Sequence, residues 1–221
     1  MQNNKPGTYE MNYETKWGKK VWLRVHVKPL ANRNTVTGAQ LIIDDITEKK
    51  RLEDDLRCLS VTDCLTDSYN RRYFTQKLEE EIERARRNGN TFSLIMLDID
   101  HFKSINDRFG HNAGDLVLKN IVELIKNRIR KIDILARWGG EEFVILLLDT
   151  TIKNAVRLAE ELRESLSRMD IPGVGRVTAS FGVSTYCSGD TADTLVNKAD
   201  KMMYEAKAAG RNCVRYMNEC E

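Results

Sequence analysis

The chain reads ILARWGGEEFVILLL from residue 134 to residue 148. Two apolar runs of strand length flank its Gly139-Gly140 pair, and paired glycines between such runs are typical of a tight hairpin turn. The stretch therefore predicts an antiparallel strand pair with Glu141 and Glu142 beside the turn. Taken alone, the pattern is also compatible with two solvated glutamates at an ordinary turn.

Helical and strand periodicities alternate on both sides of this hairpin. The predicted strands are Phe92–Asp98, Ile134–Arg137, Glu142–Leu148, Arg176–Ser184 and Asn212–Tyr216, and the predicted helices are Arg71–Arg87, Gly114–Arg130, Lys153–Ser167 and Thr191–Ala208. The central part reads β-α-β-β-α-β, which is the order of the ferredoxin-like split βαβ arrangement. We therefore expect an α+β fold class, with an antiparallel sheet and helices packed on one side of it.

The composition indicates a globular chain with no dominant charge. Its 221 residues are 41% hydrophobic, enough to bury a core, and 35 Lys and Arg nearly balance 33 Asp and Glu. The net charge gives no reason to expect a nucleic-acid partner. The longest apolar runs fall far short of the roughly 20 residues that a membrane helix needs. We expect no membrane segment in this chain, and an anchor upstream in a longer parent protein stays open.

The cysteines bear on the cellular compartment. They lie far apart and form no C-x-x-C pair, at positions 58, 64, 187, 213 and 220. This spacing predicts neither a zinc site nor a disulfide framework, and it favours a reducing, cytoplasmic location.

The N-terminal residues predict a small strand unit. Alternating runs at Val21–Val27 and Ala39–Ile43 indicate a strand pair, which is too little to bury a core without a partner chain or further residues. The run DDITEKK at residues 44–50 resembles the exit of a PAS sensor domain. We therefore interpret residues 1–46 as the C-terminal strands of a truncated PAS domain, to which no ligand can be assigned.

A charged linker follows. Residues 47–61 predict a helix with Leu52, Leu56 and Leu59 at four-then-three spacing. A short parallel coiled coil and a single solvated helix are both compatible with this pattern.

Asp98 ends the apolar strand before the hairpin. In the β-α-β-β order, this strand lies beside the hairpin, which would bring Asp98 close to Glu141 and Glu142. Three carboxylates do not crowd together cheaply without a cation. Mg²⁺ is the expected ion, because it prefers carboxylate, carbonyl and phosphate oxygens.

The run DIDHFKSINDRFGHNAGD at residues 98–115 resembles the pattern of the diguanylate cyclases, or GGDEF domains. The hairpin, the opening DCLTDSYNRR at residues 63–72 and the closing GRN at residues 210–212 resemble it too, in the same order. Asp67 stands where the family has a turn glycine, and we expect it to tolerate the left-handed turn. The resemblance implies that residues 62–221 form a GGDEF domain that condenses two GTP into cyclic di-GMP and two pyrophosphates.

The resemblance also implies metal ligands and catalytic groups. Asp98, the carbonyl of Ile99 and Glu141 would hold Mg²⁺, with Mn²⁺ as the alternative ion, and Asp100 would be a reserve ligand for a second metal. Lys103 would stabilise charge on the phosphates during transfer. We nominate Glu141 as the proton acceptor and Glu142 as its competitor, because sequence cannot separate a ligand from a base when the two are adjacent.

Substrate contacts are implied at further positions. Asp115 would accept hydrogen bonds from guanine N1 and N2, which adenine lacks as donors, and the rest of the guanine pocket would be Phe102, Asn106 and His111. For His111, helix capping or packing is an equal alternative. Lys207 and Arg211 would reach the triphosphate, although a solvated basic face would give the same pattern.

A second motif precedes the hairpin. Arg130 and Asp133 resemble the family's R-x-x-D inhibitory site for cyclic di-GMP, where Arg can fork onto guanine and Asp can accept from it. The alternative is a helix C-terminus finished by cations. The family commonly adds an arginine from the next helix, where this chain has Glu161, and Arg157 or Arg163 are the nearby substitutes.

Cyclic di-GMP as the expected product implies a particular oligomeric state. Two GTP presented across a two-fold axis require a homodimer of half-sites. Three rival interpretations remain: a catalytically dead receptor for GTP or cyclic di-GMP, a cyclase making a mixed cyclic GMP-AMP, and a signalling scaffold. The scaffold is compatible with the cyclase.

Overall fold

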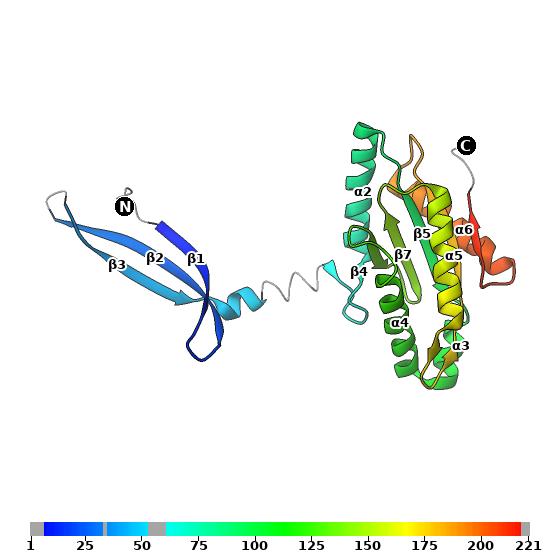
Figure 1. Ribbon diagram of the computed structural model, residues 1–221, viewed down its shortest axis with the longest axis horizontal. Coiled ribbons are helices and arrows are strands. Elements are labelled where there is room, and N and C mark those ends of the chain that lie inside the picture. The colour runs from blue at the N-terminus through cyan, green and yellow to red at the C-terminus, as the bar shows by residue number, and fades with distance from the viewer. Residues whose placement is uncertain (1–6, 33–34, 53–60, 218–221) are drawn as a thin grey trace. The chain divides into compact units, whose positions relative to one another are not determined.

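The computed structural model describes residues 7–32, 35–52 and 61–217 (Figure 1). The chain divides into two compact units, Met1–Cys58 and Leu59–Glu221. Within the described ranges, no helix is long and apolar enough to cross a membrane.

The first unit is a three-stranded antiparallel sheet. Its order is β1-β2-β3, formed by β1 (Gly7–Glu14), β2 (Lys20–Asn32) and β3 (Thr35–Asp45). The predicted strand pair corresponds to β2 and β3, whereas β1 was missed because its sequence, GTYEMNYE, lacks aliphatic residues. The PAS interpretation of this unit stays a prediction.

The linker is described only in part. Residues 47–52 are helical. Leu56 and Leu59, on which the coiled-coil prediction depends, lie outside the described residues.

The second unit is built on a six-stranded sheet of order β11-β10-β5-β7-β6-β4. Its strands are β4 (Tyr69–Asn70), β5 (Ser93–Ile99), β6 (Ile134–Arg137), β7 (Glu142–Leu147), β10 (Ala179–Thr185) and β11 (Val214–Tyr216). The four central strands pair antiparallel, while β4 and β11 add parallel edges. The predicted β-α-β-β-α-β core and α+β fold class are confirmed.

Helices cover both faces of this sheet (Figure 1), so the expectation of helices on one side only is wrong. The helices are α2 (Arg71–Asn88), α3 (Phe102–Phe109), α4 (His111–Lys126), α5 (Ile152–Arg168) and α6 (Ala192–Ala208). Ile95 and Leu97 of β5 belong to a core with α4 and α5, whereas Leu94 and Met96 belong to a core with α2 and α6. A strand that is apolar at successive positions must bury both faces, and β5 is buried at every position.

Two element boundaries differ from the predicted ones. The helix predicted from Gly114 is preceded by the separate α3, which was missed because Phe102 is its one buried side chain. Gly110, at φ 83°, separates α3 from α4. The strand predicted from Arg176 begins with β9 (Gly175–Arg176), which pairs with β8 (Asp170–Ile171), before β10.

The cysteines correct one expectation. Cys187 is disulfide-bonded, whereas Cys64 and Cys213 are free. Spacing along the sequence did not predict this bond because it does not report which thiols meet in space.

Candidate active site

The strand register brings the predicted acidic residues together. Asp98 of β5 lies opposite Glu142 of β7, and the backbone N–H of Ile99 donates to the carbonyl of Glu141 at 3.3 Å. The hairpin turn between β6 and β7 contains Gly139 and Gly140, as predicted. The three acidic residues therefore lie at the same end of the sheet.

A lysine neutralises part of this charge. Asp98 is 7% exposed, and its Oδ2 lies 2.8 Å from Nζ of Lys207 on α6. Burial raises the pKa of Asp98, and Lys207 opposes this effect, while the charges of Glu141 and Asp100 raise the pKa further. The net pKa stays raised, chiefly because burial disfavours the charged form of Asp98 and one ammonium group does not fully offset this.

Glu142 is subject to the same crowding. Its pKa is raised by burial and then by the charge of Asp98, with smaller contributions from Asp200 and Glu141, whereas Lys207 lowers it. Two neighbouring carboxylates with raised pKa values mark a site that would gain from an added cation.

The donor set fits a hard divalent cation. Asp98, Glu141 and the carbonyl of Ile99 offer oxygen ligands, and Asp98 is a buried carboxylate beside the like charges of Glu141 and Asp100. Among the residues that the structure describes, no three His, Cys, Asp or Glu side chains form a group that could hold a metal by themselves. A cation would therefore also need backbone and substrate oxygens.

The short helix α3 carries three of the predicted site residues. Phe102 is buried, Asn106 is half-buried, and Lys103 is exposed. The preceding residue, His101, has φ 58° and so turns the chain sharply between β5 and α3. Lys103 lies on the first turn of α3, on the segment that follows the metal-ligand candidates.

The helix α4 supplies the rest of the predicted guanine pocket. His111, its first residue, is exposed, and Asp115, one turn later, is half-buried. A Cβ atom on Gly114 would lie 2.0 Å from Oδ1 of Asn106. Gly114 therefore permits α3 and Asn106 to approach α4 beside Asp115, a role that sequence reasoning missed.

Asp100, the predicted reserve ligand for a second metal, is surrounded by hydrogen-bond donors of the protein. It is 4% exposed and accepts hydrogen bonds from Thr178 Oγ1 (2.7 Å), Ser180 Oγ (2.7 Å) and the backbone N–H of Asn212 (3.0 Å). Both carboxylate oxygens are thus engaged by the protein. Arg211, the second predicted phosphate contact, is exposed in the same turn as Asn212.

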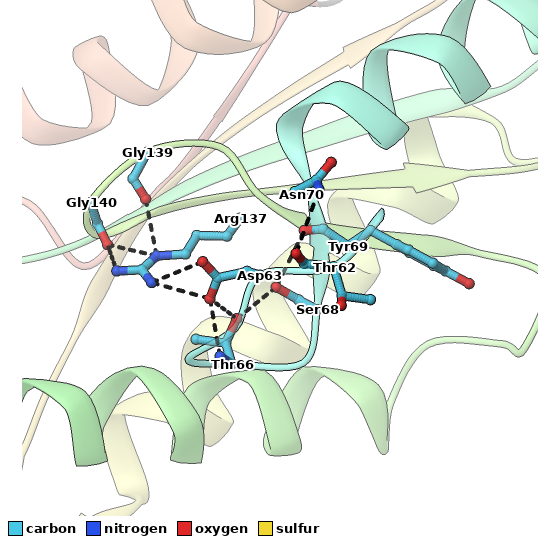
Figure 2. A network of polar contacts seen from close by, with 9 residues as sticks. All are labelled: Thr62, Asp63, Thr66, Ser68, Tyr69, Asn70, Arg137, Gly139 and Gly140. Atoms are coloured by element: carbon cyan, nitrogen blue, oxygen red, sulfur yellow. Dashed lines mark hydrogen bonds and ion pairs between the residues drawn. The ribbon is translucent and has the colours of Figure 1, made fainter. Parts of the chain in front are cut away.

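Arg137 anchors the glycine turn, a function that sequence reasoning missed. Figure 2 shows its guanidinium between Asp63 and the turn: it donates to both carboxylate oxygens of Asp63, at 3.1 and 3.2 Å, and to the carbonyls of Gly139 and Gly140. Burial opposes ionisation of Asp63, but the hydrogen bonds from Thr66 and the charge of Arg137 outweigh it and lower the pKa of Asp63. The available signal was an Asp opening the domain and an Arg directly before the hairpin.

The opening turn behaves as expected. Asp67 has φ 53°, which confirms that it adopts the left-handed conformation in place of glycine. Its carbonyl accepts a hydrogen bond of 2.7 Å from Nζ of Lys126.

In the predicted inhibitory motif, Arg130 and Asp133 form an ion pair with each other. Asp133 is buried, and its carboxylate accepts from Nε and Nη2 of Arg130 at 3.1 and 2.9 Å. A cavity of about 330 Å³ adjoins the pair, lined also by Arg128, Arg157 and Glu161. Arg163 instead pairs with Glu160 and donates to Asn212.

Comparison with known proteins gives the family. The sequence model described as "Diguanylate cyclase, GGDEF domain" matches residues 60–213. The response regulator PleD of Caulobacter vibrioides is 43% identical over 180 residues, which cover 76% of this chain and 40% of that protein. The diguanylate cyclase DgcM of Escherichia coli is 38% identical over 192 residues, covering 86% of this chain and 47% of that protein. The chain thus spans less than half the length of these relatives.

Solved structures agree with the sequence match. The GGDEF domain of DgcB from Caulobacter crescentus, in complex with c-di-GMP, has a TM-score of 0.68 at 32% identity and covers 71% of this chain and 93% of that one. The active GGEEF domain of a diguanylate cyclase from Vibrio cholerae has a TM-score of 0.65 at 33% identity, covering 68% of this chain and 98% of that one. This chain therefore belongs to the diguanylate cyclase family and contains its GGDEF domain.

Proposed function

We propose that this chain condenses two GTP into cyclic di-GMP and two pyrophosphates. The observation that carries the proposal is the β5–β7 register, which sets Asp98 opposite Glu142 with Lys207 2.8 Å from Asp98. Acidic oxygens beside a lysine suit phosphoryl transfer, which depends on positioning and charge stabilisation more than on covalent chemistry.

The substrate residues divide by the part of GTP that they would contact. Asn106 and Asp115, which Gly114 allows to lie on adjacent helices, would hydrogen-bond guanine, with Phe102 and His111 completing the pocket. The cationic residues would bind the phosphates, namely Lys103, Lys207 and Arg211. On GTP binding, Lys207 would exchange its pairing with Asp98 for phosphate oxygens.

Mg²⁺, or Mn²⁺ in its place, is the cofactor that the donor set supports. Asp98, Glu141 and the carbonyl of Ile99 would hold it, and substrate phosphates would complete its shell. When bound, the ion would neutralise phosphoryl charge and lower the pKa of the attacking 3′-hydroxyl. Glu141 is our nominee for accepting that proton. Glu142 is the competitor, because a carboxylate with a raised pKa is a stronger base at neutral pH.

Two copies of the chain would complete the reaction. Each GTP must present its 3′-hydroxyl to the α-phosphorus of the other, and a two-fold axis between two half-sites provides this symmetry. Specific activity should therefore rise with protein concentration. The N-terminal strand unit, which we interpret as a PAS remnant, and the linker after it would bring the copies together.

A turnover assay across protein concentration tests the proposal. Purified chain with Mg²⁺ and GTP should release pyrophosphate and form cyclic di-GMP, and Glu141→Ala should reduce turnover by about a hundredfold or more, as loss of a charged active-site group does. Glu83→Ala is the matched control, because Glu83 is an exposed glutamate on α2 that pairs with its helix neighbour Arg86.

The outcomes separate the rival functions. Equal activity of Glu141→Ala and wild type would refute the site assignment, and binding without turnover in a confirmed dimer would indicate a receptor. Products from mixed ATP and GTP, analysed by mass, distinguish cyclic di-GMP from a mixed cyclic dinucleotide.

We further propose that cyclic di-GMP inhibits the enzyme through Arg130 and Asp133. The adjoining cavity supports this, because Arg157 lines it and could serve where the family's second arginine is replaced by Glu161. Arg157 is also near Glu161, with 3.9 Å between Nε and Oε1. Binding would require Arg130 to release part of its contact with Asp133, a cost that weakens inhibition.

A further inference from the structure

The turn after α6 has an unusual backbone. Gly210, Arg211 and Asn212 have φ angles of 109°, 65° and 44°. Only glycine adopts this left-handed region without steric cost, so Arg211 and Asn212 must be held there by their contacts.

Hydrogen bonds hold the turn at each of its three residues. The backbone N–H groups of Gly210 and Arg211 donate to the carbonyls of Lys207 and Ala206 at 3.4 and 3.1 Å, which closes the end of α6. The backbone N–H of Asn212 donates to Oδ2 of Asp100 at 3.0 Å, and Oδ1 of Asn212 accepts from Nη1 of Arg163 at 3.3 Å. Of these acceptors and donors, Asp100 is the one that belongs to the segment carrying the candidate metal ligands.

Asp100 also binds the neighbouring strand. Its Oδ1 accepts from Ser180 Oγ and its Oδ2 from Thr178 Oγ1, each at 2.7 Å. Hydrogen bonds to an ionised acceptor are stronger than neutral ones, and burial of Asp100 keeps water from replacing them. The carboxylate thus joins three segments: the end of β5, the start of β10 and the turn after α6.

The turn and the end of α6 carry two of the three cations assigned to the triphosphate. Lys207 lies in the last turn of α6, and Arg211 lies within the left-handed turn. A shift of this turn would move Arg211 directly. Lys207 would move less, because α6 holds its backbone.

We propose that Asp100 is a positioning residue, whose carboxylate fixes the turn that presents Arg211, and with it Lys207, to the phosphates of GTP. This inference rests on the proposed function, since it takes the phosphates as the ligands of these cations. It replaces the expected role of Asp100 as ligand of a second metal.

The two roles predict opposite behaviour of an amide at this position. In Asp100→Asn, the amide oxygen can still accept from the backbone N–H of Asn212. The amide NH₂ can face Ser180, whose hydroxyl can turn to accept. The hydrogen bonds that hold the turn would therefore remain in Asp100→Asn. A metal ligand at this position would instead be weakened by loss of its charge. Asp100→Ala removes all of these side-chain hydrogen bonds.

The test is steady-state kinetics of the full chain, with GTP and Mg²⁺ varied separately. Asp100→Ala should raise the KM for GTP about tenfold with a smaller change in kcat, and Asp100→Asn should stay within about threefold of wild type. Both variants should keep the wild-type half-saturating Mg²⁺ concentration. A rise in that concentration for Asp100→Asn would overturn the proposal.

Asp190 offers a matched control for a purely structural effect. Its carboxylate is also buried and also accepts from the protein, from Cys187, Thr194 and Lys198, but at the start of α6. Asp190→Ala should lower Tm about as much as Asp100→Ala and leave the KM for GTP unchanged. A wild-type KM in Asp100→Ala, or an equal rise in Asp190→Ala, would refute a positioning role.

Failure of the proposed cyclase function can be distinguished from failure of the positioning role of Asp100. If wild type binds GTP in calorimetry but forms no cyclic di-GMP, the cyclase proposal fails. The positioning proposal is then judged by GTP affinity alone, which should fall about tenfold in Asp100→Ala and change little in Asp100→Asn.

Discussion

At the level of single residues, the candidate site depends on close approaches that glycine alone permits. Gly114 is buried in α4, and a Cβ there would lie 2.0 Å from Oδ1 of Asn106 and 3.1 Å from Cζ of Phe102. Helix propensity would favour alanine at this position by about 1 kcal/mol. The glycine is therefore explained by the position of Asn106 rather than by the stability of the helix.

Gly114→Ala should displace Asn106 and raise the KM for GTP by about fivefold or more, because one misplaced hydrogen bond to the base is worth about 1 kcal/mol. Steady-state kinetics and circular dichroism together measure this. Gly38→Ala is the control, since a Cβ at Gly38 meets nothing within 4 Å. An unchanged KM in Gly114→Ala would contradict the placement of Asn106 in the guanine pocket.

The raised pKa of Glu142 makes stability depend on pH. When the pKa of a carboxyl is raised by folding, its contribution to the free energy of unfolding is fully present below the unfolded pKa, here 4.5. That contribution is lost as the pH rises through the raised pKa of the folded state. Glu142→Gln removes that loss. The variant should therefore melt about 1 to 3 °C above wild type at pH 7, although its turnover falls.

Thermal unfolding at pH 4 and pH 7 checks this prediction. Near pH 4 the glutamate is largely protonated in both states, so wild type and Glu142→Gln should have nearly equal Tm values. A Tm difference that is the same at both pH values would show that the effect comes from packing rather than from charge.

At the level of elements, α6 must approach the sheet closely to bring Lys207 to Asp98. A Cβ on Gly182 of β10 would lie 2.0 Å from the carbonyl of Ala199 and 2.2 Å from the backbone nitrogen of Met203. These are backbone atoms of α6, which cannot rotate away as a side chain can. Gly182 therefore allows α6 to pack directly against β10.

Gly182→Ala should push α6 outward and lower the free energy of unfolding by about 2 to 3 kcal/mol, which is the usual cost of overpacking a core. Urea denaturation measures this change, with Gly38→Ala again as control. Because Lys207 moves with α6, turnover should fall as well. Full stability in the variant would show that the helix can shift without cost.

At the level of the whole molecule, the candidate active site and the proposed inhibitory site lie at separate places on one domain. The carboxylates of the candidate active site lie where β5 meets the hairpin turn. The Arg130–Asp133 pair lies beyond α4, where Arg130 also donates to the carbonyl of Leu148 after β7. Because β7 begins at Glu142 and ends near Leu148, one strand connects the two places.

Arg130→Ala should relieve product inhibition without abolishing turnover. The concentration of cyclic di-GMP that halves the rate should rise about tenfold or more, because a forked arginine contact contributes about 1 to 3 kcal/mol. Lys131→Ala is the neighbouring cation to use as control. Inhibition that is equally strong in wild type and Arg130→Ala would refute this site.

Much of the fold and the site was predictable because the decisive signals are local. The Gly139-Gly140 turn and its flanking apolar runs specify the hairpin, and the end of β5 at Ile99 explains why Asp98 lies at one end of the sheet. Less local features were missed. The short α3 has few buried side chains, and the two-faced burial of the sheet depends on helices that lie far away in sequence.

The sequence by itself determined the β-α-β-β-α-β order, the family and the candidate carboxylates, because periodicity and motif spacing are properties of neighbouring residues. Only the tertiary structure decided which groups meet: Lys207 with Asp98, Arg137 with Asp63, and Asp100 with Asn212. Each of these pairs joins residues that are distant in sequence. Their contact depends on strand register and helix packing, which no local pattern specifies.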